Sequence, residues 1–427
     1  MNIKTTKNEI FQLGEVIKPT AKTVSILITV DVFNENTAKE SALNLLYSDL
    51  LLAGAGKFSR TEFSHLIDEL GSSIDVSASL GRINITVGSL AEKLKPTLKL
   101  LETMLLSPSF KSVERARVVR TLKNTLELNK ENARALALLG LKNSLFTKKN
   151  RQYSFSPDEL ISVVDEIKIE DLKKLHQNLL NSFWTVSVGG NEKSVTETLQ
   201  FIKKIKKTTQ TIAKEPVETL VSYVGRQVLI KEVKSKQNIE VSIGASLPLT
   251  LTDEELPAFI FGLAVLGMWG GFAGRLMSIV RAKEGLTYMI YARTEGISVT
   301  ENGYWRITSF FSPKDVIKGL TSTLREINTI QQKGISASEL ERFRIILKTN
   351  ETLIFDSLLS TTNHVHGKIV SGLSWNEYVD FRDKIYNCSR SQVNAVLKKY
   401  LSSENITISV AGPTSSVEKD LQHLGKM

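Results

Sequence analysis

The chain has 427 residues, 41% of them hydrophobic and 23% charged, which is the composition of a folded globular protein and not of a disordered one. This length exceeds one ordinary core and suits two domains of about 200 residues each. The formal net charge is +10, but the lysines are spread along the whole chain. Nucleic-acid binding requires the charge to be focused on one face, so we do not expect a nucleic-acid partner.

Neither export nor membrane insertion is indicated. The N-terminal segment "MNIKTTKNEIFQLG" has no apolar core and is no signal peptide, so we expect a cytoplasmic protein if this is the full native chain. Cys388 is the only cysteine, which excludes an internal disulfide. Residues 256–274 carry no charge, but they contain a proline and five glycines, and Thr252 with Glu255 predicts a helix cap directly before them. We predict a buried helix that leads into a glycine loop, and no membrane span.

The first half of the chain begins with an alternating strand at 22–32, which is followed by an apolar helix at 40–54. Further strands are indicated within 72–89, and helical sequence within about 91–145. The segment 184–200, "WTVSVGGNEKSVTETLQ", has the pattern of an alternating strand, a glycine turn and an amphipathic helix.

Lysines then cluster in "KKIKKTTQTIAK" at 203–214. Charge runs are usually solvated, so we interpret this segment as part of a connector between domains. We place the first domain at 1–205, the linker at 206–225 and the second domain at 226–427.

The second half repeats the order of the first. An alternating strand at 237–249 precedes an apolar helix at 253–271, strands are indicated within 286–312, and helices within 314–355. The segment 406–422, "ITISVAGPTSSVEKDLQ", matches the strand–turn–helix segment of the first half at a constant offset of 222, with eight identical residues. We infer a duplicated α+β fold with two homologous domains, each a mostly antiparallel sheet covered by helices on one face.

One stretch of the second half, "GGFAGRLMSIVRAKEGLTYMIYAR" at 270–293, combines glycines with basic and aromatic residues. Gly270 and Gly271 precede a helix, as in a phosphate-binding loop, but no GK[ST] follows them and no strand comes directly before them. We therefore do not expect nucleotide binding. Arg275, Arg281 and Lys283 could equally pair with acidic neighbours such as Glu284.

Arg281 and Tyr288 form the most suggestive pair in this stretch. They lie seven residues apart across Gly285, where we expect the helix to end at a residue with positive φ and a strand to begin. This geometry can direct a guanidinium and a phenol into one cavity. Both groups are donors suited to a carbonyl or carboxylate oxygen. Alternatively, Arg281 pairs with Glu284 or with a carbonyl, and Tyr288 belongs to the core.

The stretch resembles the second-domain signature of pitrilysin/insulinase-type zinc peptidases, a family that includes the mitochondrial processing peptidase. The resemblance extends through "YSDLLLAGAGKFSRTEFSHLIDELGSSIDVSAS" in the first half and through the ends of both halves. It implies two related α+β domains, which agrees with the duplication. It also implies that Arg281 and Tyr288 bind the backbone of a substrate peptide.

The first half departs from the family at the zinc motif. Active members carry H-x-x-E-H on the helix before a G-T turn, and aligning that turn with Gly54 and Ala55 places the motif at residues 45–49. There the chain has Leu45, Ser48 and Asp49, so both histidines and the catalytic glutamate are missing. Glu127 and Glu131 lie near the place of the family's third ligand. One carboxylate cannot hold a catalytic zinc alone, so we expect no metal in this chain.

The five histidines do not replace the missing ligands. His65, His176 and His423 are isolated in the sequence, and His364 and His366 stand at i and i+2, which are not on one face of a helix. We interpret all five as ordinary surface or core residues. No G-x-S-x-G elbow indicates another hydrolytic site.

These observations favour a non-catalytic, substrate-binding subunit of a heteromeric zinc metallopeptidase. The expected partner is a homologous chain with an intact H-x-x-E-H, which would hold the zinc, and the expected substrate is a peptide or unfolded polypeptide. The alternative is a peptidase-derived structural or assembly protein without a role in proteolysis. An independently active enzyme is a third hypothesis.

Overall fold

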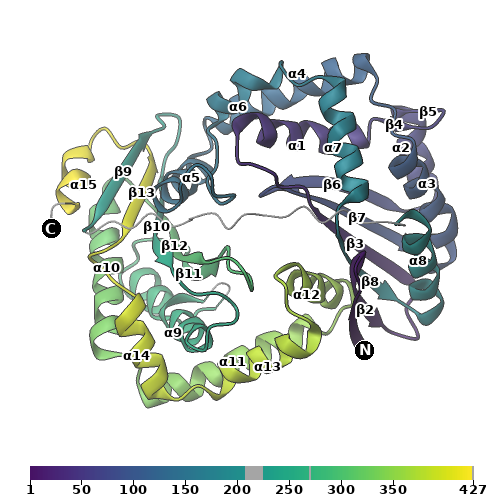
Figure 1. The fold of residues 1–427 in the computed structure, drawn as a ribbon. Helices are drawn as coiled ribbons and strands as arrows, with labels where there is room; N and C mark the ends of the chain where they lie inside the picture. Colours follow the sequence, from purple (N-terminus) through teal and green to yellow (C-terminus); the bar gives the residue numbers. More distant parts are fainter. Residues whose placement is uncertain (207–224, 269–270, 426–427) are drawn as a thin grey trace. The chain divides into compact units, whose positions relative to one another are not determined.

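The protein contains two main β-sheets, whose strands place successive side chains on opposite faces. The computed structural model describes residues 1–206, 225–268 and 271–425. These form two compact units (Figure 1): unit 1 contains residues 1–127, 155–216 and 351–378, and unit 2 contains residues 128–154, 217–350 and 379–427.

Unit 1 contains a six-stranded sheet, sheet 1, with the order β1-β2-β8-β3-β7-β6. All neighbours are antiparallel except β2 and β8, which are parallel. The strands of sheet 1 are β1 (Asn2–Lys7), β2 (Phe11–Ile17), β3 (Thr23–Asp31), β6 (Ser73–Ser79), β7 (Arg82–Leu90) and β8 (Trp184–Gly190), and a small hairpin is formed by β4 (Gly54–Ala55) and β5 (Phe58–Ser59). The helices that begin in unit 1 are α1 (Ala38–Leu51), α2 (Arg60–Glu69), the short η1 (Ala91–Lys93), α3 (Leu94–Leu106), α4 (Ser112–Asn129), α6 (Pro157–Val164), α7 (Ile169–Asn181), α8 (Glu192–Ile205) and α12 (Leu358–Val370).

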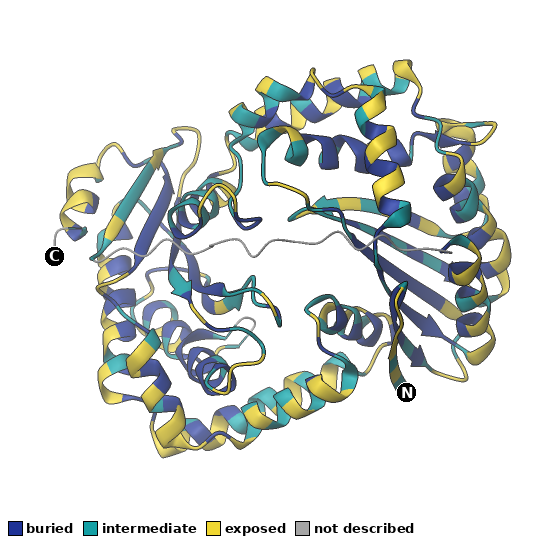
Figure 2. Cartoon of the chain, viewed as in Figure 1, coloured by how far each residue is buried: buried dark blue, intermediate teal, exposed yellow. Residues whose placement is uncertain are grey.

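Sheet 1 is covered on both faces. Val186 and Val188 of β8 point into the main core with α1, α3 and α7, whereas Ser187 and Gly189 point toward α12. This alternation follows from the period of two along a strand. β2, β3 and β8 are mostly buried, whereas the edge strands β1 and β6 are largely exposed (Figure 2).

Unit 2 repeats the arrangement. Its five-stranded sheet, sheet 2, has the order β11-β12-β10-β13-β9, and only β13 and β9 are parallel. The strands are β9 (Gln227–Glu232), β10 (Ile239–Leu247), β11 (Ile290–Glu295), β12 (Gly303–Phe311) and β13 (Thr407–Gly412). The helices are α5 (Ala133–Leu145), α9 (Leu256–Gly267), η2 (Met277–Lys283), α10 (Val316–Lys333), α11 (Ala337–Ile354), α13 (Trp375–Asn387), α14 (Arg390–Tyr400) and α15 (Glu418–Leu424), of which α11 and α13 cross the boundary between the units.

The duplication inferred from the sequence is present in the topology. β8 and β13, the two copies of the repeated strand, each pair in parallel with the strand at or near one edge and antiparallel with the central strand. The two sheets therefore share one strand order, and β1 is an addition to sheet 1. The α+β class and the mostly antiparallel sheets are confirmed.

The structure differs from the sequence interpretation in how helices are shared. α5 comes from the first half of the chain but packs on β10 and β13 of sheet 2, and α12 comes from the second half but packs on β2 and β8 of sheet 1. Each sheet thus has a helix on its second face, which we did not predict. The units are consequently not the continuous ranges 1–205 and 226–427. Of the predicted linker, residues 207–224 lie outside the described residues.

Two local predictions were wrong. The cap before α9 is not formed by Thr252 with Glu255, because the backbone N–H and hydroxyl of Thr250 donate to the carboxylate of Asp253 at 2.7 Å each. Lys206 is not solvated, since it is only 3% exposed and its Nζ donates to the carbonyl of Ser182 at 2.8 Å. Across the described ranges, every helix is too short or too polar to cross a bilayer.

Candidate functional site

The segment that carries Arg281 leads from α9 to β11. Its helix starts near Arg275 and passes into η2, a π-helix, in which the backbone hydrogen bonds join residues five apart instead of four. π-Helical turns are frequent at functional sites. Met277 and Val280 anchor the inner face in the core of unit 2, so the outer face is held in place. Of the predicted glycine pair, Gly271 lies just before this helix and Gly270 falls outside the described residues.

Gly285 ends the helix as predicted. Its φ is +66°, in the left-handed region that glycine adopts without strain. Its N–H donates to the carbonyl of Arg281 at 3.0 Å, and the N–H of Leu286 donates to the carbonyl of Val280 at the same distance. The chain turns here, and three residues later Tyr288 precedes β11.

Arg281 and Tyr288 come together across this turn. The guanidinium carbon of Arg281 lies over the ring of Tyr288, 4.4 Å from its centroid, and over the ring of Phe272, 4.6 Å from its centroid. Both distances are within the range of a cation–π contact. The two rings are unusually exposed, Phe272 at 68% and Tyr288 at 73%. The three side chains, which we call the Arg281 cluster, therefore form an aromatic and cationic surface feature of unit 2.

Glu284 and Arg275 are paired, but not with Arg281. Glu284 accepts hydrogen bonds from Ser322 Oγ at 2.5 Å and from Arg325 Nη2 at 2.7 Å, and these bonds lower the pKa of its carboxyl group. Arg275 forms a bidentate pair with Glu339 at 2.7 and 2.8 Å. Within the described part of the chain, the guanidinium of Arg281 has no hydrogen bond or ion pair. The alternatives that it pairs with Glu284 and that Tyr288 belongs to the core are wrong.

The helix that should carry the zinc motif, α1, belongs to unit 1. Ser48 is buried, and its hydroxyl donates to the carbonyl of Asn44 at 2.9 Å within the helix. Leu45 is half-buried against the core, while Asp49 is exposed. The side chains at the three motif positions thus offer a single carboxylate.

The possible substitutes for the zinc ligands are engaged elsewhere. Glu131 lies in unit 2 and accepts a hydrogen bond from Ser235. His176 is buried beside α1, but its Nε2–H donates to the carbonyl of Leu105 at 3.0 Å and its Nδ1 accepts from Tyr47 Oη at 2.8 Å. Among the described residues, no group of three or more histidine, cysteine or acidic side chains can hold a metal ion. The residues present do not fit a zinc site.

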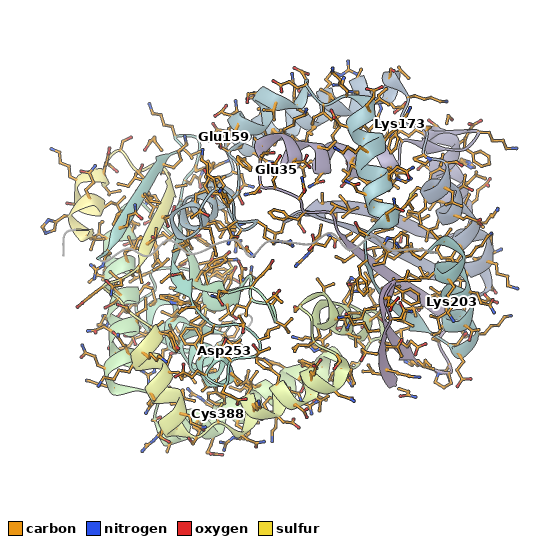
Figure 3. The ribbon with its side chains drawn as sticks, viewed as in Figure 1. Glu35, Glu159, Lys173, Lys203, Asp253 and Cys388 are labelled. Atoms are coloured by element: carbon orange, nitrogen blue, oxygen red, sulfur yellow. The ribbon has the colours of Figure 1, made fainter. Side chains whose placement is uncertain are left out.

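His364, His366 and the cysteine have structural roles. His366 of α12 lies between Thr29 and Ser187, and His364 packs on an aromatic group that includes Tyr378 at 4.9 Å between ring centroids. Cys388, labelled in Figure 3, is buried between α13 and α14, and burial raises the pKa of its thiol to about 11. At neutral pH this thiol is therefore no nucleophile.

Comparison with known proteins agrees with this geometry. Residues 166–347 match the peptidase M16 inactive domain. The non-peptidase homolog YmxG of Helicobacter pylori is 23% identical over 380 residues, which cover 88% of this chain and 84% of that protein. Part of the chain is thus similar to the M16 inactive domain, and most of it is similar to a non-peptidase homolog.

Solved structures share the fold of this chain. The crystal structure of a peptidase M16 inactive domain from Pseudomonas fluorescens matches 97% of this chain and 99% of its own, with a TM-score of 0.82 and 19% identity. A chain of Complex III2 from Candida albicans, with Inz-5 bound, matches 99% of this chain and 100% of its own, with a TM-score of 0.75 and 15% identity. The resemblance to the pitrilysin/insulinase-type family is confirmed, and the matches are to proteins described as inactive or non-peptidase.

Phe272 was quoted within the family-like stretch but was not predicted as a site residue. A large aromatic residue that directly follows two glycines is expected in an exposed loop, and this pattern could have indicated Phe272 as a site residue. Its contact with Arg281 joins residues nine positions apart across a π-helical turn, and a π-helical turn has no recognisable sequence pattern.

Proposed function

We propose that this chain is the non-catalytic, polypeptide-binding subunit of a heteromeric zinc peptidase. A homologous partner with an intact H-x-x-E-H would hold the zinc, which supplies a polarised water and a Lewis acid when bound. The role of this chain would be to bind and orient an extended polypeptide, and it would hydrolyse nothing by itself.

The observation that carries the proposal is the Arg281 cluster. An arginine with no ionic partner among the described residues, resting on two exposed aromatic rings, is costly for a purely structural surface but suited to binding. Arginine and tyrosine are also the side chains that most often dominate the energy of interfaces. In addition, β6 of unit 1 is an edge strand whose residues are alternately exposed, and such an edge can pair with the backbone of an extended peptide.

A separate binding subunit makes physical sense for peptide hydrolysis. Holding the scissile carbonyl in the correct geometry lowers the barrier independently of the group that attacks it. The two tasks can therefore reside in different chains, and the loss of the zinc ligands from α1 does not remove the binding task.

The test uses the complex copurified from the natural source, with an Arg281→Ala, Tyr288→Phe double substitution in this chain. Losing a charged hydrogen bond should cost about 1.5–3 kcal/mol, or roughly 10- to 100-fold in kcat/KM for peptide hydrolysis. Assembly, measured by size-exclusion chromatography, should remain intact. Arg390→Ala at the exposed start of α14 is the matched control. Undiminished hydrolysis in the double variant would contradict the proposal.

An assembly role is the second candidate. It is favoured by the likeness in fold to a chain of Complex III2, which covers the whole length of both chains, and by large apolar side chains exposed on α4, Val113 at 71% and Leu128 at 75%. For that role, the Arg281 double variant should leave every property of the complex unchanged, while Leu128→Glu should impair its assembly.

A further inference from the structure

The ligand of the Arg281 cluster could present either a neutral carbonyl oxygen or a charged carboxylate. A peptide carbonyl is neutral, whereas an aspartate, a glutamate or the C-terminus of a chain presents a carboxylate. Resting on the proposed function, we infer that the Arg281 cluster selects polypeptide segments that carry a carboxylate, and that Phe272 is a specificity-determining residue of this site.

The first argument is the availability of the donors. The guanidinium carbon of Arg281 lies over the rings of Phe272 and Tyr288, 4.6 and 4.4 Å from their centroids. The N–H groups of this guanidinium have no acceptor among the described residues, so they are available to a ligand. The planar fork of N–H donors matches the two oxygens of a carboxylate, which a single carbonyl oxygen cannot do.

The second argument is charge. The nearest acidic residue in sequence, Glu284, is engaged by Ser322 and Arg325, and Glu339 is engaged by Arg275. Arg281 therefore keeps an uncompensated positive charge with respect to the described residues, while the two rings exclude part of its water. A carboxylate neutralises this charge, whereas a carbonyl leaves it in place.

The third argument is preorganisation. The bidentate bond of Arg275 to Glu339 holds the beginning of the helix, and Gly285 ends it at a defined point. The ring contacts then restrict the long side chain of Arg281 before any ligand arrives. Restricting a side chain in its bound geometry improves affinity, so removal of the Phe272 ring should weaken carboxylate binding even though Phe272 donates no hydrogen bond.

The experiment titrates the full chain with fluorescein-labelled ten-residue peptides of alanine, glycine and serine, followed by anisotropy at low salt. One pair is amidated at the C-terminus and has glutamate or glutamine in the middle. A second pair has no acidic residue and ends in either a free carboxylate or an amide. We expect the carboxylate member of at least one pair to bind about tenfold more tightly. A preference in the first pair assigns a side chain, and one in the second pair assigns a chain terminus.

The variants make the inference specific. Arg281→Gln should abolish the preference, Arg281→Lys should retain only part of it because the fork is lost, and Phe272→Leu should reduce it several-fold. Arg390→Gln, which also removes an exposed positive charge from unit 2, should leave the preference as it is. If all peptides bind equally and Arg281→Gln weakens them all alike, the carboxylate inference is overturned and polypeptide binding stands. If no peptide binds to the wild-type chain, the proposed function fails together with the inference.

Discussion

α12 on sheet 1 and α5 on sheet 2 occupy corresponding places in the two units, yet different chemistry attaches them. Both helices cover the second face of a five- or six-stranded sheet, and both lie beside the duplicated strand, β8 or β13. The sheets expose the same type of face to both helices because of the duplication. The hydrogen-bonded side chains between helix and sheet are neutral in unit 1, whereas unit 2 combines a neutral contact, Ser144 Oγ donating to Thr407 Oγ1 at 2.8 Å, with charged groups on the same sheet.

In unit 1, a histidine joins α12 to the sheet. Thr29 donates its hydroxyl proton to Asn84 at 2.7 Å, so its oxygen accepts from Nε2–H of His366 at 2.9 Å. Nδ1 of His366 then accepts from Ser187 Oγ at 3.0 Å. The neutral ring satisfies both hydroxyls, and burial lowers the pKa of His366 to about 4.

In unit 2, the corresponding face contains ions. Arg306 of β12 is 5% exposed, and its Nη2 donates to Glu295 of β11 at 2.9 Å. Tyr304 donates to the same carboxylate at 2.5 Å and packs its ring against Phe146, directly after α5, with 5.6 Å between centroids. The two interfaces thus show that a duplicated fold does not require duplicated interface chemistry. They predict that the α5 interface depends on charge pairing and the α12 interface on pH.

The largest effect should come from Glu295→Gln. This change leaves Arg306 as a buried cation without its counter-ion, which should lower the free energy of unfolding by about 3 kcal/mol. Hydrogen–deuterium exchange followed by mass spectrometry should show faster exchange in α5, because the amide offers Tyr304 and Arg306 one acceptor oxygen instead of two, while exchange in α12 stays as in the wild type.

Glu341→Gln is the matched control for this prediction. Glu341 also pairs with an arginine, Arg344, but its side chain is 66% exposed, so the expected cost is below about 1 kcal/mol. A Glu295 variant as stable as the Glu341 variant would show that α5 is held by apolar packing and not by the buried ions.

The next effect is the acid sensitivity of the α12 interface. The pKa of His366 is about 4 in the folded chain, below the ordinary value of 6.5, so the unfolded chain binds the extra proton between these values. His366 therefore contributes no pH dependence above pH 6.5, and stability should fall as the pH drops from 6.5 to 4, by up to about 3 kcal/mol.

Urea denaturation at a series of pH values measures this loss. His366→Gln keeps one donor and one acceptor for Thr29 and Ser187 but does not titrate, so its acid branch should be flatter than that of the wild type. His364, whose pKa burial also lowers to about 4, would remain to produce a residual slope. Identical slopes in both proteins would eliminate His366 as a source of acid sensitivity.

α5 and α12 each pack on the sheet that is built mainly from the other half of the chain, and this arrangement shows which parts of the fold the sequence could predict. The duplication and the α+β class follow from local patterns, since strand alternation and a repeated glycine turn are visible within 184–200 and 406–422. The choice of sheet for α5 is not local, because both sheets offer the same kind of face beside β8 and β13. A contiguous domain boundary was therefore the natural but incomplete prediction.

At the candidate site, the sequence located the residues but not all their partners. The turn at Gly285 was predictable because a glycine between a helical and an alternating pattern indicates a positive φ. The pairing of Glu284 with Arg325 was not, since α10 approaches only in the folded unit. The role of Arg281 in binding remains a prediction.

A smaller, purely steric effect on stability should distinguish the α12 interface from the α5 interface. A Cβ at Gly189 of β8 would overlap Oγ1 of Thr362 in α12 and lie 3.2 Å from Cδ1 of Leu358. Thr362 is fully buried and its hydroxyl donates to the carbonyl of Leu358 at 2.7 Å, so it cannot turn away freely. Gly189→Ala should cost about 1–3 kcal/mol by overpacking, measured by urea denaturation. A cost near zero would mean that α12 can shift on sheet 1.

The smallest effect is expected for the same substitution at the α5 interface. A Cβ at Gly140 would overlap Oγ of Ser409 in β13, but this hydroxyl can rotate to a different staggered position. Gly140 also lies inside a helix, where alanine is favoured over glycine by about 1 kcal/mol. The two contributions oppose each other, so Gly140→Ala should change stability by less than about 1 kcal/mol.

Gly367→Ala in α12 is the control that measures the helix preference alone, because no atom lies within 4 Å of the added Cβ. This substitution should stabilise the chain by about 0.5–1 kcal/mol. If Gly140→Ala instead costs as much as Gly189→Ala, close backbone approach holds α5 as firmly as α12, and the contrast between the interfaces is confined to their polar groups.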